Sequence, residues 1–177
     1  MKEPIMYRNT ILCGCVIGLL VALNHNVTAA GPALPIPAAI LPFESRGDVQ
    51  EEAAQVADLL FANLIISEHV MLVERQTIDN VFEELKLSKA GLVNADEASK
   101  VGKLTGAKLL ITGSVLQVND DLYLVAKVIG TETSRLAGAS VKGSSTADLG
   151  ELVKQLAAEV DQVVAKKAKT LLPKPVP

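Results

Sequence analysis

Few residues of this chain are of types that could do chemistry, and the first to weigh is a histidine. His69 is the single histidine outside the first thirty residues, so a metal site there would need carboxylates as its other ligands. We interpret His69 as a turn or strand-edge residue. Ser114 stands between Gly113 and Val115 and lacks the G-x-S-x-G frame of a nucleophile elbow. Neither residue predicts a catalytic centre.

Two more pairs of residues are explained by helix geometry. Glu83 and Glu84 are adjacent, and adjacent helical residues point about 100° apart, so we interpret them as a solvated helix face. Gly102 and Gly106 flank the end of a predicted helix instead of opening one, so they form no phosphate-binding loop. We therefore predict no catalytic residue, no metal site, no cofactor and no enzymatic activity.

The pair Glu74 and Arg75 is the strongest candidate for an interaction site. It follows a short apolar run, Val70 to Val73, and precedes a predicted helix. One interpretation is that the pair faces a partner protein. The other, which we favour, is that Arg75 ties loops together at the sheet edge. Both interpretations stay open at the level of the sequence.

A short basic cluster, Lys166-Lys167-Ala168-Lys169, lies at the end of the last predicted helix. Cations at a helix C-terminus interact favourably with the helix dipole, which is the simpler explanation. The alternative is contact with an anionic membrane surface. We therefore keep peripheral association with the outer membrane as a hypothesis.

Residues 1–30 have the order of a secretory signal peptide. Lys2 and Arg8 precede the apolar run Ile11 to Leu23, and Val27-Thr28-Ala29-Ala30 offers small residues for cleavage. We expect cleavage near Ala29 or Ala30 and export to the periplasm, the space bounded by the outer membrane. Both cysteines, Cys13 and Cys15, would leave with this segment, so the mature protein would have no disulfide.

Two alternatives to a cleaved signal remain. An uncleaved anchor is disfavoured because thirteen helical residues span about 20 Å, less than a bilayer core of about 30 Å. The segment Leu12-Cys13-Gly14-Cys15 resembles a lipobox with Cys15 as the acylated residue. A lipobox closes the apolar run, however, whereas Cys15 stands near its start, so lipoprotein anchoring at Cys15 is the minor alternative.

The composition fits one domain with an aliphatic core. The chain has 177 residues, of which 49% are hydrophobic and only 3% aromatic, so Val, Leu, Ile and Ala must fill the interior. The net charge is −3, and the absence of a basic, aromatic-rich stretch argues against nucleic-acid binding. Residues 31–37 form a proline-rich lead-in, residues 38–172 the domain, and residues 173–177 a proline-rich tail.

The pattern of apolar residues predicts nine elements. Strands are expected at residues 38–43, 70–73, 109–118, 122–129 and 136–141. A first helix, capped by Asp48, runs to about Ser67 and buries Val49, Ala53, Val56, Ala57, Leu60 and Leu64. A second helix buries Ile78, Val81, Phe82 and Leu85. A third, capped by Asn94 and ended by Gly106, buries Ala98, Val101 and Leu104. The last, about 147–169, buries Leu149, Leu152, Leu156, Val160, Val163 and Val164.

The resulting order is β-α-β-α-α-β-β-β-α. A βα unit at the start favours a crossover connection, and three strands with short turns favour an antiparallel meander. We therefore predict an α/β (α+β) fold with a single mixed sheet of about five strands and helices packed on it. Both faces of the strands are apolar enough that we expect helices to cover them.

Four segments occur in an order that resembles the curli assembly/transport family, the CsgG-type domain. They are Ala39 to Glu44, Leu72 to Arg75, Leu92 to Asn94 and Gly106 to Val115. The wider group includes TolB-N-like and LpoB-like envelope domains. The resemblance covers roughly Ala38 to Gly143 and implies a bacterial periplasmic domain, often tethered at the outer membrane.

The founding member of that family has a membrane-spanning part for which this sequence has no room. It is a lipoprotein that forms a ring-shaped secretion channel, and each subunit lends long hairpins to a transmembrane barrel. A membrane strand needs about 9–11 residues, whereas the connections here are residues 119–121 and 131–134. The resemblance therefore implies the soluble fold and the envelope location, and we expect no transmembrane barrel of the chain's own.

The leading hypothesis is a non-enzymatic envelope protein, an accessory or scaffold in secretion or surface assembly, with envelope proteins as partners. One alternative is a regulator that binds and activates an envelope enzyme, as LpoB-like domains do. Another is a periplasmic domain that binds a small ligand or metal. Because the founding member of the family forms a ring of subunits, the resemblance also suggests a homo-oligomer.

Overall fold

The chain divides into two units, Met1–Gly31 and Pro32–Pro177. A computed structural model describes residues 34–85 and 95–174, all of them in the second unit. The predicted signal peptide, Asn94 and residues 175–177 lie outside the described residues. The described part begins in the predicted lead-in and ends in the predicted tail.

Within residues 34–85 and 95–174, nine elements follow one another in the predicted order. They are β1 (Ile36–Arg46), α1 (Gln50–Leu64), β2 (Val70–Leu72), α2 (Arg75–Glu84), α3 (Ala95–Thr105), β3 (Leu109–Val118), β4 (Asp121–Gly130), β5 (Leu136–Ser144) and α4 (Leu149–Leu171). The predicted fold class, one mixed α/β sheet with helices packed on it, is therefore confirmed.

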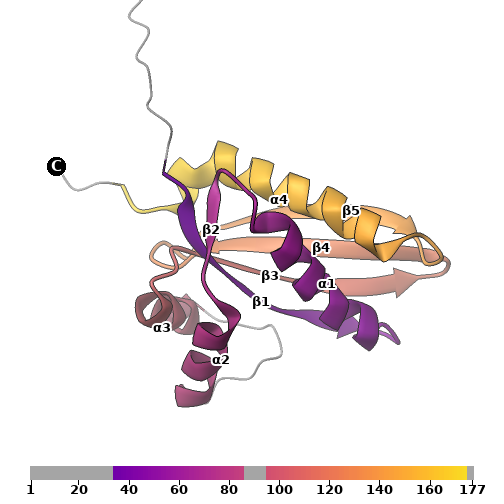
Figure 1. Ribbon diagram of the computed structural model, residues 1–177, viewed down its shortest axis with the longest axis horizontal. Coiled ribbons are helices and arrows are strands. Elements are labelled where there is room, and N and C mark those ends of the chain that lie inside the picture. Colours follow the sequence, from indigo (N-terminus) through magenta and orange to yellow (C-terminus); the bar gives the residue numbers. More distant parts are fainter. Residues whose placement is uncertain (1–33, 86–94, 175–177) are drawn as a thin grey trace, which may run out of the picture. The chain divides into compact units, whose positions relative to one another are not determined.

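The five strands form one sheet in the order β2-β1-β3-β4-β5 (Figure 1). Strand β1 pairs in parallel with both β2 and β3, while β3, β4 and β5 form an antiparallel meander. The parallel pairs require crossovers, which α1 supplies between β1 and β2. The antiparallel strands need only short turns, as the Asn119-Asp120 and 131–135 connections provide.

Strand β1 is longer than predicted and passes through two prolines. Pro37 contributes only its carbonyl, which accepts the backbone N–H of Lys108 at 2.8 Å. At Pro42 the pairing with β3 shifts register, between Ile40 and Phe43. A β-bulge of this kind leaves a residue out of the ladder, so a proline is tolerated within a central strand. Pro37, which was assigned to the proline-rich lead-in, therefore lies inside β1.

The sheet has a large core on one face and a smaller one on the other. The helices α1 and α4 lie side by side over the first face (Figure 1) and bury Val56, Leu60, Leu156 and Val160 against it. On the opposite face, α2 and α3 pack on β1 and β3 and enclose the smaller core: Ala39, Leu41, Ile78, Val81, Phe82, Ala98, Val101, Ala107 and Leu110.

Three sequence predictions about these helices and strands are wrong. Asp48 does not cap α1: Val49 occupies the N-cap position, and no side chain caps this end. Val49 is buried in the core, which sets where the helix can start, and Asp48 is exposed. Leu104 is 49% exposed instead of buried. Finally, helices do not cover both faces of β4 and β5, as described below.

The glycine predicted to end the third helix does so. Gly106 follows α3 with a φ of +74°, a left-handed conformation that glycine adopts without steric cost. None of the helices in residues 34–85 and 95–174 is long and apolar enough to cross a membrane.

Candidate interaction surface

On the face of the sheet opposite α4, most of β4 and β5 lies beyond the part that α2 and α3 cover, since these two helices pack on β1 and β3. In β4, residues alternate between buried and half-buried over its whole length, since α4 covers only one side of the strand. Cross-strand pairing places the side chains opposite α4 together, because directly paired residues share a face. We call this group the open sheet face: Leu116, Tyr123, Val125, Lys127, Ser140 and Lys142.

The open sheet face combines aromatic, aliphatic and cationic groups. The ammonium of Lys142 lies 5.4 Å from the centre of the Tyr123 ring, in cation–π range, and 2.8 Å from Oδ2 of Asp121. Hydrogen bonding to the Asp121 carboxylate, and then to the Tyr123 hydroxyl, raises the pKa of Lys142. Lys142 is therefore a fixed positive charge at neutral pH.

Ser114, weighed above as a nucleophile, lies on the same side of the sheet as this face. It is 5% exposed and pairs with Glu44 of β1 and Val125 of β4. The imidazole of His69 contacts Asp161 instead, so the one histidine among the described residues is not the base of the Ser114 hydroxyl. A serine needs an adjacent base to act as a nucleophile, and the arrangement supplies none from His69.

His69 does take part in a polar cluster, with Ser67 and Asp161. Its Nδ1 lies 2.9 Å from Oδ2 of Asp161 in α4, while the Ser67 hydroxyl donates to the other carboxylate oxygen. The Ser67 oxygen also accepts the backbone N–H groups of His69 and Val70, each at 3.0 Å. We call these three residues the Ser67–His69–Asp161 clasp, since they fasten the turn before β2 to α4.

The clasp contains the residue types of a catalytic triad in the wrong arrangement. In a triad the serine hydroxyl is bonded to the histidine, and the carboxylate orients that histidine. Here the carboxylate stands between the two, so the Ser67 hydroxyl is bonded to the carboxylate and not to the imidazole. His69 lies at the turn before β2, as predicted, but its partner lies 92 residues away, and no local pattern could have indicated it.

The structure places Glu74 and Arg75 at the start of α2. Glu74 is the N-cap residue, and its carbonyl accepts the backbone N–H groups of Thr77 and Ile78. The Arg75 guanidinium forms an ion pair with the carboxylate of Asp58 in α1. Both Glu74 and Arg75 are exposed. Arg75 thus links α2 to α1, and a role of the pair in binding a partner stays a prediction.

The remaining candidates lie apart from one another. Glu83 and Glu84 are exposed at the end of α2. Gly102 is buried in α3, where a Cβ atom would stand 2.5 Å from Cβ of Thr131, so its role is close packing. Across the two described ranges, no group of three or more His, Cys, Asp or Glu side chains could hold a metal ion.

Comparisons with known proteins place this fold in context. The family model described as "Curli production assembly/transport component CsgG" matches residues 43–123. No curated protein matches the chain. Among solved structures, the chain is similar to the LpoB C-terminal domain from Salmonella enterica, with 16% identity and a TM-score of 0.50, covering 66% of this chain and 88% of that one.

A second solved structure is lipoprotein GNA1162 from Neisseria meningitidis, with 14% identity and a TM-score of 0.49, covering 75% of this chain and 99% of that one. The family match begins at Phe43, just after the bulge of β1, and ends at Tyr123 in β4. It therefore includes α1, α2, α3 and the central strand β3. Residues 43–123 thus match the CsgG family model, in agreement with the resemblance predicted from the sequence.

Proposed function

We propose that this chain is a non-enzymatic protein of the bacterial cell envelope that serves as an accessory or scaffold in secretion or surface assembly. The observation that carries the proposal is the match of residues 43–123 to a family named for an assembly and transport component. The proposed location is the periplasm, reached by a cleaved signal peptide. The proposed partners are other envelope proteins.

The open sheet face supports a binding role. It presents Tyr123, with Lys142 held over its ring, and half-buried Val125. Aromatic side chains are enriched in protein–protein interfaces, where a rigid ring buries area at low entropic cost. We propose this face as the partner-binding surface of the domain. The outer edge of β5 is a further place where copies of the chain could pair, and a homo-oligomer is part of the proposal.

Site-specific crosslinking tests this function. A photoreactive residue at Val125 or Ser140, on the open sheet face, is compared with one at Gln55, an exposed position of α1 on the opposite side of the sheet. Capture of a secretion or surface-assembly component in intact cells, specific to the first two positions, is the expected result. Capture only at Gln55, or equally at all three, would remove the open sheet face from the proposal. Sedimentation of the purified chain at micromolar concentration tests the oligomer.

A regulator of an envelope enzyme is the second candidate. The observation that favours it is the fold shared with the LpoB C-terminal domain. The two functions differ in the identity of the captured partner. If that partner is an enzyme whose turnover rises when the purified chain is added, the regulator is correct and the scaffold proposal fails.

A further inference from the structure

Four lysines gather where α4 ends. Lys166, Lys167 and Lys169 lie in the last turns of the helix and Lys174 lies beyond it; all four are exposed. We call this group, with the apolar residues described next, the basic end. No acidic residue occurs between Lys166 and Lys174, on a chain whose net charge is −3. Positive charge is therefore concentrated at one place on an acidic protein.

Capping of the helix does not account for these lysines. The carbonyl of Thr170 accepts a hydrogen bond from the Arg135 guanidinium at 3.0 Å, and that of Leu171 accepts the Thr133 hydroxyl at 2.6 Å. The backbone N–H of Leu172 bonds the carbonyl of Ala168. The last carbonyls thus have other donors, and Lys174 lies outside the helix, where the dipole no longer acts strongly.

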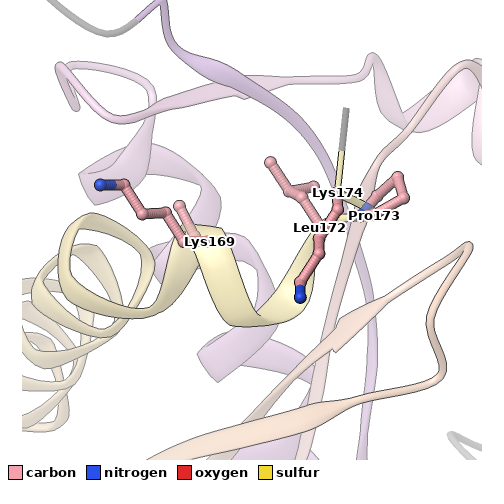
Figure 2. A pocket seen from close by; sticks show the side chains of 5 residues that line it. Lys169, Leu172, Pro173 and Lys174 are labelled. Atoms are coloured by element: carbon pink, nitrogen blue, oxygen red, sulfur yellow. The ribbon is translucent and has the colours of Figure 1, made fainter. Parts of the chain in front are cut away.

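An open hollow of about 530 Å³ lies beside these lysines, lined by Ala168, Lys169, Leu172, Pro173 and Lys174. In Figure 2, Lys169 projects from the last turn of α4, apart from the group that Leu172, Pro173 and Lys174 form where the chain leaves the helix. Ala168, Leu172 and Pro173 form the apolar floor of the hollow, and its two charged residues are both lysines.

The apolar surface continues past Ala168. A small adjoining hollow of about 50 Å³ is lined by Leu34, Ile36, His69, Val164, Ala165 and Ala168. Leu34 is 87% exposed, although a leucine gains about 1.5–3 kcal/mol when it is removed from water. Exposed aliphatic side chains thus stand next to unpaired ammonium groups, since no ion pair joins Lys167, Lys169 or Lys174 to a carboxylate in the described residues.

We propose that the basic end binds the surface of an anionic phospholipid bilayer. Lysines there would contact lipid phosphates, while Leu34 and the apolar floor would enter the boundary between head groups and acyl chains. Interfacial binding of this kind combines buried apolar area with attraction to anionic lipid. An acidic protein segment would match the lysines but would leave Leu34 without an apolar partner. The proposal does not rest on the function proposed above.

Vesicle flotation tests the proposal with the full chain. Vesicles of phosphatidylcholine alone are compared with vesicles of phosphatidylcholine and phosphatidylglycerol. We expect binding to the mixed vesicles to exceed binding to the neutral ones and to weaken as salt is added, because ions screen exposed charges. The apolar run Ile11 to Leu23 is the same in every variant, so comparisons between variants cancel its contribution.

The decisive comparison is between two triple variants that remove the same charge. Lys167→Gln, Lys169→Gln and Lys174→Gln together should weaken binding to the mixed vesicles on the order of a hundredfold, since each lysine near an anionic bilayer contributes about fivefold. Lys100→Gln, Lys103→Gln and Lys154→Gln, at exposed positions elsewhere, should keep most of the binding. Leu34→Ser should weaken binding severalfold.

Three results would overturn the proposal. The first is equal binding to neutral and anionic vesicles. The second is an equal loss in the two triple variants, which would mean that only net charge matters. The third is binding of the chain to polyglutamate through Lys167, Lys169 and Lys174 without binding to anionic vesicles, which would assign the basic end to an acidic protein. Thermal melting of each variant shows that it is folded before binding is measured.

Discussion

Nδ1 of His69 lies 2.9 Å from Oδ2 of Asp161, so a residue of the turn before β2 is bonded to one in α4 across 92 positions of the chain. The same carboxylate accepts the hydroxyl of Ser67, which in turn accepts two backbone N–H groups. The turn between α1 and β2 is thus bonded through two of its side chains to the last helix. The clasp thus links two segments of the domain that are distant in sequence, the turn before β2 and helix α4.

Asp161→Ala should lower the free energy of unfolding by about 1–3 kcal/mol. The substitution removes the acceptor of both Ser67 and His69, and polar groups that lose a partner while partly buried cost about that much. Urea denaturation followed by circular dichroism measures the change. Glu159→Ala, at an exposed position of the same helix, is the control and should stay within about 0.5 kcal/mol of the parent. Equal effects at the two positions would show that the clasp does not stabilise the fold.

Leu60→Ala and Val115→Ala should each destabilise the domain by roughly 1–4 kcal/mol. Both side chains are fully buried, Leu60 in α1 and Val115 in β3, and both belong to the large core. Truncation removes apolar contacts and leaves a cavity that the neighbours fill only in part. Leu104→Ala serves as the control because Leu104 is 49% exposed. Chemical denaturation in which Leu104→Ala costs as much as the other two would contradict the assignment of the core.

The order and type of the elements could be predicted because periodicity records burial. The face of α1 formed by Val56, Leu60 and Leu64 repeats at helical spacing, and all three residues are buried. In β4 the alternation of Leu122 and Leu124 with half-buried neighbours has the period of a strand. Gly106 marks the end of α3 because its left-handed φ suits glycine. These signals are local, so a single sequence contains them.

What could not be predicted depends on contacts between distant segments. The bulge that admits Pro42 exists because β1 pairs with β3 on both sides of it. Val49 displaces Asp48 from the N-cap because the core requires the valine. The uncovered side of β4 and β5 follows from where α2 and α3 pack, on β1 and β3. The apolar residues of β4 indicated burial on both faces. The sequence of a strand, however, does not determine how many helices pack on each face of the sheet.

Gly113→Ala should destabilise the domain more than a typical substitution. A Cβ atom on Gly113 would stand 2.0 Å from the carbonyl oxygen of Val125 and 2.4 Å from the Phe43 ring. Since the Val125 oxygen is a backbone atom, the clash can be removed only if β3 and β4 move apart. Overpacking of a core costs about 1–3 kcal/mol or more. Gly138→Ala, where the nearest atom would be 3.2 Å away, should cost clearly less. Melting temperatures of the two variants decide, and a reversed order would contradict the close approach of β3 and β4.

Asp121→Asn should lower the pKa of Lys142 towards its ordinary value. The Asp121 carboxylate is the larger cause of the raised pKa, and the Tyr123 hydroxyl adds to it. A raised pKa in the folded protein stabilises it at every pH below the unfolded value, and this contribution is lost as the pH rises through the folded pKa. The parent and variant should therefore differ in stability least in strongly alkaline solution. NMR titration of the Lys142 side chain measures the pKa, and an unchanged value in Asp121→Asn would refute the pairing.

The ion pair of Arg75 with Asp58 allows the two interpretations of the Glu74-Arg75 site to be separated. Both side chains are about half or more exposed, and exposed ion pairs contribute about 0.2–1 kcal/mol. A double-mutant cycle of Arg75→Ala and Asp58→Ala should give a coupling energy in that range. If Arg75 acts only by linking α2 to α1, then Asp58→Ala alone should reproduce the effects of Arg75→Ala on stability and on capture of a partner. If Arg75 binds a partner directly, Arg75→Ala should abolish capture while Asp58→Ala preserves it.

Glu74→Gln completes the set, because it removes the neighbouring carboxylate and leaves in place the backbone carbonyl that accepts the N–H groups of Thr77 and Ile78. Loss of capture in Glu74→Gln with unchanged melting would assign the pair to the interface, whereas retention of capture in all three variants would leave Arg75 as a link between two helices.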